Sequence, residues 1–173
     1  MKQEDVCAAL ARLYADVDYQ SQQLCQIHSE RLRCGRGCCS CCVDGLTVHE
    51  IEANNIQRHH RGLLETGIPH QEGACAFLNE EGACRIYEHR PYVCRTQGLP
   101  LRWIEQRGDG CVREMRDICP LNESGEPIEN LPEEECWSIG PFEGKLARLQ
   151  AVAGDGEMRR IALRDLFIRR GRR

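Results

Sequence analysis

Cysteine thiols are the residues of this sequence whose type and spacing could do chemistry. Thirteen of the 173 residues are cysteines, and five of these lie within residues 34–42. A hydrophobic core needs apolar volume and does not explain such a run of thiols. Thiolates bind soft or borderline metal ions, and their mutual repulsion at this density has to be offset by cations. The run therefore predicts a metal site.

The spacing inside this run is typical of metal ligands. Cys38 and Cys41 form a C-x2-C unit, and Cys34 lies four residues upstream. Gly35 and Gly37 allow the backbone to turn so that the sulfurs point inward. Such units occur in zinc sites and are equally typical of iron–sulfur ligation. The spacing leaves the choice between zinc and an iron–sulfur cluster open.

Three cysteine motifs follow one another in the chain: C-x3-C-x2-C-C from residue 34, C-x-F-L…G-x-C-x-I-Y from residue 75, and R-P-x-x-C-R from residue 90. In this order they resemble the bacterial YkgJ-like cysteine-cluster family of zinc- or iron-chelating domain proteins. The similarity covers residues 34–119. It implies a small metal-binding domain with cysteine ligation of zinc or an iron–sulfur centre. Some larger relatives join this domain to protein lysine methylation.

The resemblance also implies eight ligands by motif position. Cys119 is chosen as the eighth over Cys111, with Cys136 as a further alternative, and Cys39 stands where the family more often has glycine. Seven or eight thiolates suit two four-ligand sites. The predicted metal ligands are Cys34, Cys38, Cys41, Cys42, Cys75, Cys84, Cys94 and Cys119.

Other candidate residues receive simpler interpretations. Cys7 and Cys25 are expected to flank the first helix, Cys111 to lie in a strand, and Cys136 to be buried. Histidines are not expected to be ligands, although His70 and His89 are near ligands in sequence. Arginines beside the ligands are either cations that screen the thiolates or ordinary surface residues. These arginines are Arg36, Arg85, Arg90 and Arg95.

The elements that must position the cysteines can be predicted from periodicity. Residues 3–33 carry a heptad seam of Val6, Leu10, Leu13, Val17, Gln20, Leu24 and Ile27, which predicts a long helix. We expect this helix to dock on its own domain; the alternative is a pairing arm that makes a homodimer. Thr47 and Glu50 form a capping-box pattern, which predicts a second helix up to about Arg61.

The later cysteines fall on short elements. Residues 75–87 predict a β-hairpin in which Leu78 faces Ala83, and this register would place Cys75 and Cys84 on one face. Pro91 suits the first turn of a short helix that carries Cys94. A second strand pair is expected across residues 107–110.

The C-terminal third follows a polar, Glu-rich loop at residues 121–132. Two amphipathic helices are expected after it. The first is striped by Phe142, Leu146, Leu149 and Ala153, and the second by Met158, Ile161, Leu163, Leu166 and Phe167.

These elements predict a mostly helical α+β fold in which a Cys-rich metal-binding loop and a small β-hairpin pack with helices. We divide the chain into an N-terminal helix at 1–33, a cysteine-cluster domain at 34–121, and an acidic loop with C-terminal helices at 122–173. A net charge of −4 does not favour nucleic acid as a partner. No membrane span is expected, and the N-terminus lacks the features of a secretory signal, so we expect a cytoplasmic protein.

These observations favour a cytoplasmic metal-binding protein with a structural or electron-transfer role. An all-thiolate ligand set leaves no open position for a substrate. The alternatives are a thiol- or iron–sulfur-dependent protein-modifying enzyme and a metal-stabilised adaptor. The sequence does not decide whether the protein is an enzyme.

Overall fold

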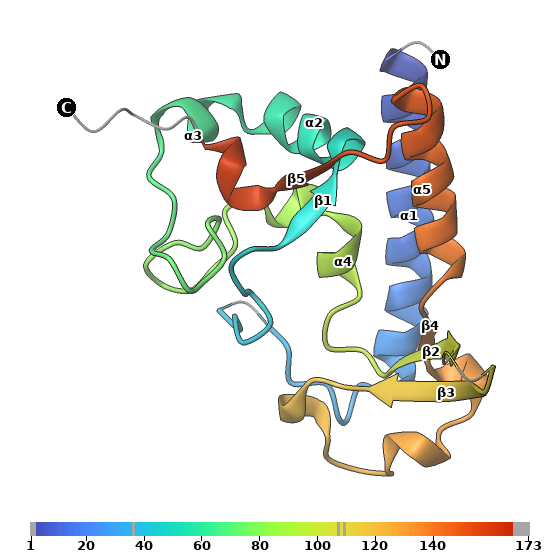
Figure 1. Cartoon of the computed structure of the whole chain (residues 1–173). Helices are drawn as coiled ribbons and strands as arrows, with labels where there is room; N and C mark the ends of the chain where they lie inside the picture. Colours follow the sequence, from blue (N-terminus) through green and yellow to red (C-terminus); the bar gives the residue numbers. More distant parts are fainter. Residues whose placement is uncertain (1–2, 36, 107, 109, 168–173) are drawn as a thin grey trace. The chain divides into compact units, whose positions relative to one another are not determined.

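The computed structural model describes residues 3–35, 37–106, 108 and 110–167. Its elements run from helix α1 near the N-terminus to strand β5 and a 3₁₀ turn near the C-terminus (Figure 1). The chain divides into two compact units, each built from segments that are distant in sequence. The first unit comprises Met1–Arg12, Gly35–Pro91 and Leu146–Arg173, and the second comprises Leu13–Cys34 and Tyr92–Lys145.

Helix α1 spans Gln3–Ile27 and contributes residues to both units. It confirms the predicted N-terminal helix but ends before residue 33. A turn at residues 28–31 follows, where the guanidinium of Arg31 donates to the carbonyls of Ser124 and Glu126. The apolar seam is largely buried within the chain. Its buried members are Val6, Leu10, Leu13, Val17 and Leu24, whereas Gln20 and Ile27 are exposed.

In the first unit, a small two-stranded sheet replaces the beginning of the predicted second helix. Strand β1, Thr47–His49, pairs antiparallel with β5, Arg160–Ala162. Helix α2 therefore begins at Glu50 and runs to His59, and the His49 N–H donates to Glu52 Oε2 over 3.3 Å. The predicted helix start at Thr47 is wrong because this segment is paired as a strand. Helix α3, Arg61–Thr66, follows.

Of the two predicted C-terminal helices, the first is confirmed and the second is wrong. Helix α5 spans Pro141–Ala153, as expected. The second predicted helix is absent from its described residues, which form β5 and the 3₁₀ turn Leu163–Leu166. Gln150 of α5 is fully buried in the first unit. Its Oε1 accepts the N–H of Ile51 over 3.1 Å, and its Nε2 donates to the carbonyl of Glu157.

The core of the first unit is aliphatic around one pair of aromatic rings. The rings of Phe77 and Phe167 lie 5.0 Å apart, and Cys75 and Cys84 pack against this core. The two cysteines are thus positioned by their packing against the apolar core. The core comprises Val48, Ala53, Ile56, Leu64, Ala76, Phe77, Ile86, Leu163, Leu166 and Phe167.

The second unit contains a three-stranded sheet in the order β3-β2-β4. Strands β2, Leu101–Gln106, and β3, Val112–Asp117, pair antiparallel and confirm the predicted strand pair, while β4, Trp137–Ser138, joins β2 in parallel. Residues 107 and 109 of the connection lie outside the described part. Helix α4, Tyr92–Arg95, confirms the short helix that carries Cys94.

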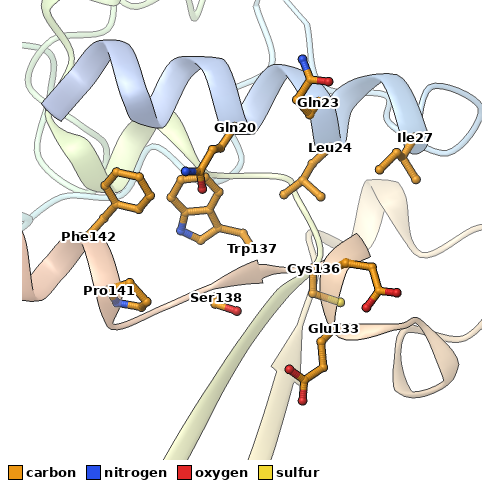
Figure 2. A pocket seen from close by; sticks show the side chains of 11 residues that line it. Gln20, Gln23, Leu24, Ile27, Glu133, Cys136, Trp137, Ser138, Pro141 and Phe142 are labelled. Atoms are coloured by element: carbon orange, nitrogen blue, oxygen red, sulfur yellow. The ribbon is translucent and has the colours of Figure 1, made fainter. Parts of the chain in front are cut away.

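An apolar groove of about 340 Å³ lies in the second unit beside α1 (Figure 2). The stacked rings of Trp137 and Phe142, 5.2 Å between centroids, form part of its wall, and Leu24 comes from α1. Trp137 Nε1 donates to the hydroxyl of Tyr92, which in turn donates to Glu143 Oε1. These bonds fix the aromatic cluster at the start of α5.

The remaining regular structure consists of short 3₁₀ turns. They give the Glu-rich segment a defined path rather than that of an open loop. The α+β, mostly helical class is confirmed. These turns are Tyr87–His89, Pro120–Asn122, Ile128–Asn130 and Glu133–Glu135.

Candidate metal centre

The cysteine-rich loop of the first unit consists of two consecutive turns. The N–H of Cys38 donates to the carbonyl of Gly35 over 3.0 Å, and the N–H of Cys42 donates to the carbonyl of Cys39 over 2.9 Å. Cys38 Sγ lies 3.9 Å from Ser40 Oγ. Cys38 and Cys42 are half-buried, whereas Cys41 is exposed. The loop thus presents several thiols over a short length of backbone.

Backbone pairing brings the end of this loop to the second cysteine motif. The N–H of Cys75 donates to the carbonyl of Cys42 over 2.9 Å. The next residue of one segment and the preceding residue of the other, Val43 and Ala74, form an isolated antiparallel bridge. Cys42 and Cys75, which the sequence separates widely, are therefore held side by side by the main chain.

The segment that carries Cys75 and Cys84 is a tight loop with a single bridge between Leu78 and Cys84. The predicted register, with Leu78 opposite Ala83, is wrong by one residue. Asn79 causes the difference, because its Oδ1 accepts the N–H groups of both Glu81 and Ala83 and closes a compact turn.

Cys75 and Cys84 share the same local geometry. Burial raises the pKa of each thiol, and a backbone N–H two residues further along the chain hydrogen-bonds to the sulfur and acts in the opposite direction. The donor is Phe77 for Cys75 and Ile86 for Cys84. An N–H group directed at a sulfur favours its thiolate form. The same hydrogen bond thus favours the thiolate form at both sulfurs.

Four thiols of the first unit lie near enough to influence one another. Burial and, after it, the neighbouring thiols together raise the pKa of the Cys42 thiol to about 12. Several thiolates at this spacing repel one another, so a cation must join them if they are all to ionise. The neighbours of Cys42 are Cys41, Cys75 and Cys84.

The donor set fits zinc or iron in its chemistry, since soft thiolates are the ligands these metals take in structural and electron-transfer sites. Within the described residues, no three or more His, Cys, Asp or Glu side chains are grouped as they would be around a metal ion. The sulfurs approach one another without closing to coordination geometry. Closing the site therefore requires side-chain adjustments on a backbone that is already paired.

Three predicted ligands belong to the second unit: Cys34, Cys94 and Cys119. Cys34 Sγ accepts a hydrogen bond from Asn122 Nδ2 over 3.2 Å. The N–H of Asn122 donates to the carbonyl of Cys119 over 2.7 Å. Cys94 lies half-buried on α4. Cys34 and Cys119 are thus both hydrogen-bonded to a buried polar residue that the sequence did not single out.

Cations near the first-unit thiols come partly from unexpected positions. Arg85 and Arg90 lie close enough to favour the Cys84 thiolate, which fits the first of the two interpretations given to the arginines beside ligands. Arg85 is held by the carbonyls of Ile68 and Ala76. Arg164, which was not among the predicted arginines, acts on Cys75 together with Arg85. These arginines supply positive charge around the thiols.

The other two arginines that lie beside ligands in sequence are Arg95 and Arg36. Arg95 belongs to the second unit, where it pairs with Asp18 at 2.5 Å and lies 4.0 Å over the ring of Tyr14. The structure therefore gives Arg95 a partner other than a thiolate. Arg36 lies outside the described residues.

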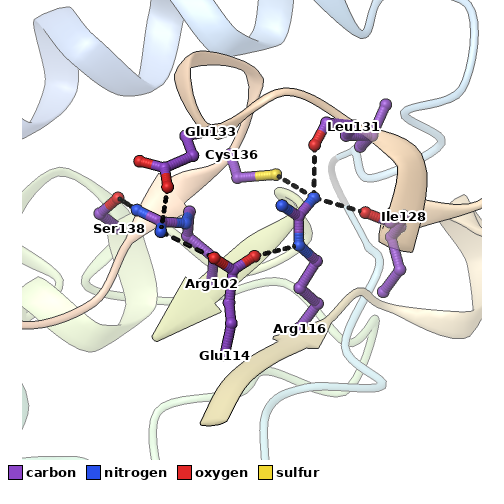
Figure 3. A network of polar contacts seen from close by, with 8 residues as sticks. All are labelled: Arg102, Glu114, Arg116, Ile128, Leu131, Glu133, Cys136 and Ser138. Atoms are coloured by element: carbon purple, nitrogen blue, oxygen red, sulfur yellow. Dashed lines mark hydrogen bonds and ion pairs between the residues drawn. The ribbon is translucent and has the colours of Figure 1, made fainter. Parts of the chain in front are cut away.

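Cys136 is buried, as expected, and belongs to a network of charged residues (Figure 3). Arg116 Nη1 lies 3.6 Å from Cys136 Sγ and donates to the carbonyls of Ile128 and Leu131. Because Arg116 contacts the sulfur itself, its guanidinium would have to move before Cys136 could bind a metal ion in place of Cys119. Glu114 bridges Arg116 to Arg102 in the same network.

Among the remaining cysteines, Cys39 packs on a turn. Its sulfur would lie 3.4 Å from a Cβ atom placed on Gly82. Cys7 is half-buried, and Cys25 and Cys111 are exposed; Cys111 directly precedes β3 rather than lying in it. None of these four is among the thiols that act on Cys42.

Three histidines cluster in the first unit. His60 Nε2 lies 3.0 Å from His89 Nδ1, and the rings of His59 and His89 stack at 3.9 Å. The three histidines thus form a ring cluster at the end of α2. Burial and the two neighbouring rings lower the pKa of His60.

Comparison with known proteins identifies the cysteine region. The model of the CxxCxxCC family, described as a "putative zinc- or iron-chelating domain", matches residues 33–120. No curated protein and no solved structure matches the chain. None of the helices in the described residues has the length and apolar character needed to span a membrane. Because the match covers half of the sequence, and all eight predicted ligands lie within it, the chain belongs to the CxxCxxCC family of zinc- or iron-chelating domains.

Proposed function

We propose that this protein is a cytoplasmic metal-binding protein whose cysteine cluster holds zinc or an iron–sulfur centre in a structural or electron-transfer role. Family membership supports the binding of zinc or iron. The observation that carries the proposed site is the main-chain pairing of Cys42 with Cys75, next to the bridge at Cys84. Because this pairing does not depend on the thiols, the backbone can present the sulfurs before metal arrives.

The proposed ligands fall into two groups. In the first unit, Cys42, Cys75 and Cys84 form the centre, with Cys41 or Cys38 completing it. In the second unit, the proposed ligands are Cys34, Cys94 and Cys119. The paired N–H groups at Cys75 and Cys84 support this assignment, since hydrogen bonds to sulfur stabilise metal-bound thiolates and tune cluster potentials.

A structural or electron-transfer role follows from the ligand type. Catalytic zinc keeps one position open for water or substrate, whereas four thiolates close the coordination sphere. Zinc in such a site would supply folding free energy, and an iron–sulfur cluster would carry electrons. In both cases the chain's own residues hold the ligands in place and screen their charge, through Arg85 and Arg164.

The test is metal and sulfide analysis of protein purified without oxygen, together with its ultraviolet–visible spectrum. Stoichiometric zinc in a colourless sample would support the structural role. Iron, sulfide and broad visible absorbance would support electron transfer. Protein that binds neither metal after reconstitution would refute the proposal.

Ligand substitutions make the test specific. Cys75→Ser and Cys84→Ser should each lower the bound metal, because each removes a sulfur that faces the same centre. Cys25→Ser is the matched control, since Cys25 is exposed on α1 and outside the family match. Full metal content in both ligand variants would remove these residues from the site.

A further inference from the structure

Asn122 is a polar residue that is fully buried in the second unit, and every polar group of its side chain is used. Its Nδ2 donates to Cys34 Sγ over 3.2 Å and to the carbonyl of Gly98 over 2.7 Å. Its Oδ1 accepts the N–H of Arg33 over 2.8 Å. One side chain thus ties the residue before Cys34, the sulfur of Cys34 and a distant loop together.

The orientation of this amide is determined by its partners. The carbonyl of Gly98 can only accept, so the nitrogen must face it, and the remaining N–H of that nitrogen is then directed at the sulfur. A carboxylate in the same place would put oxygen against both the carbonyl and the sulfur. Asn122 therefore meets a chemical requirement that an isosteric aspartate cannot meet.

Gly98 shapes the space around the same sulfur. Its φ is +94°, and a Cβ atom there would lie 2.6 Å from Cys34 Sγ and 3.3 Å from Asn122 Nδ2. The first approach is well below van der Waals contact, and the positive φ itself favours glycine, so glycine lets the loop lie this close to the sulfur. The backbone and the amide together confine the Cys34 sulfur.

The same residue is connected to a second proposed ligand. The backbone N–H of Asn122 donates to the carbonyl of Cys119 over 2.7 Å. Movement of the 3₁₀ turn Pro120–Asn122 would therefore disturb the side chain at Cys34 and the main chain at Cys119 together.

We propose that Asn122 is the positioning residue of the metal-ligand set in the second unit: its side-chain N–H holds Cys34 in ligand orientation and stabilises the metal-bound thiolate. This inference rests on the proposed function, because it requires Cys34 to bind metal. A neutral donor is suited to this role, because it stabilises a thiolate by hydrogen bonding without bringing a cation to compete with the metal.

The first experiment follows the alkylation rate of each cysteine by mass spectrometry in zinc-loaded protein. Asn122→Asp should increase the alkylation rate of Cys34 about 10-fold or more, because loss of a hydrogen-bond partner of a ligand typically weakens metal affinity by about 10- to 100-fold and so exposes the thiolate. Alkylation of Cys75 and Cys84 should stay at the wild-type rate. Asn54→Asp, on the exposed surface of α2, is the control with the same change of charge.

A second experiment uses the wild-type protein, so that it does not depend on the folding of a variant. Cadmium in its NMR-active form replaces zinc, and a scalar correlation is sought between the metal and the Asn122 side-chain N–H through Cys34 Sγ. The correlation is expected only if the N–H···S bond and the S–metal bond exist together. A purely packing role for Asn122 would give none.

The outcomes separate this inference from the proposed function. If zinc protects Cys42, Cys75 and Cys84 but Cys34 reacts equally in Asn122→Asp and Asn54→Asp, or if cadmium shows no correlation, the role of Asn122 is refuted and the function stands. If zinc protects none of these cysteines in the wild-type protein, the proposed function itself is refuted.

Discussion

Arg164 and Asp44, 120 residues apart in the chain, form a two-pronged ion pair in which Arg164 Nε donates to Asp44 Oδ1 over 2.9 Å and Arg164 Nη2 lies 2.8 Å from Asp44 Oδ2. Hydrogen bonding to Arg164 lowers the pKa of Asp44 to about 2. The same guanidinium donates to the carbonyls of His70 and Ala74. The pair thus fastens the segment after Cys42 to the segment before Cys75.

Arg164→Lys should loosen the metal centre although it keeps the positive charge. A lysine cannot reproduce the fork that binds a carboxylate and two carbonyls at once. We expect zinc to leave the variant about tenfold faster, measured by transfer to a chromogenic chelator. Arg159→Lys is the control, since Arg159 makes an exposed ion pair with Glu50 in the same unit. Equal zinc release from the two variants would contradict this role.

Gln150→Ala should destabilise the first unit by about 1–3 kcal/mol. The substitution leaves the buried N–H of Ile51 and the carbonyl of Glu157 without their partner, and buried unsatisfied groups cost about this much. Urea denaturation measures the free energy of unfolding. Gln57→Ala on the exposed side of α2 should change it little, and a similar loss in both variants would argue against this account.

Leu10→Ala tests whether the seam of α1 serves folding or dimerisation. Leu10 is 2% exposed within the chain, so its truncation should lower the free energy of unfolding by about 2–5 kcal/mol. The mass measured by light scattering should stay the same for wild type and variant at every concentration. A mass that falls on substitution would instead support the pairing arm.

The histidine cluster should make stability depend on pH. The pKa of His60 is lowered in the folded state by burial and by His89 and His59. Below about pH 6.5 the unfolded state therefore binds more protons than the folded state. The contribution of neutral His60 to the free energy of unfolding is complete above about pH 6.5 and is lost as the pH falls below it.

The change in urea midpoint between pH 7.5 and pH 5.5 measures this effect. His60→Gln should reduce the change, because it removes the group that titrates. His70→Gln, outside the ring cluster, should leave it as in the wild type. An identical pH response in wild type and His60→Gln would show that other groups carry the dependence.

The elements that were predicted correctly have strong local signals. The apolar seam of α1, the apolar stripe of α5 and the strand pair around residues 107–110 can each be recognised from the residues of one continuous segment. Both wrong helix assignments have one cause. Residues 47–49 and 160–162 are strands only because they pair with each other across the chain, and three residues carry too little pattern to reveal this.

The cysteines of the candidate site can be recognised in the sequence, whereas the residues that hold them in place cannot. The types and spacing of the cysteines indicate metal directly. Arg164 and Asn122 gain their roles from contacts with residues 120 and 88 positions away, which no local pattern encodes. The register error at Leu78 has a different origin, because the side chain of Asn79 changes the turn itself.

The ion pair between Arg164 and Asp44 also bears on biosynthesis. A ribosome makes the cysteine loop early and Arg164 120 residues later, and β5, which pairs with β1, also comes late. Throughout this interval the nascent chain carries exposed thiols without the clamp that joins Asp44 to the segment before Cys75. Oxidation and premature metal capture therefore threaten the growing chain more than the finished protein, so metal loading is best completed after translation has passed Arg164.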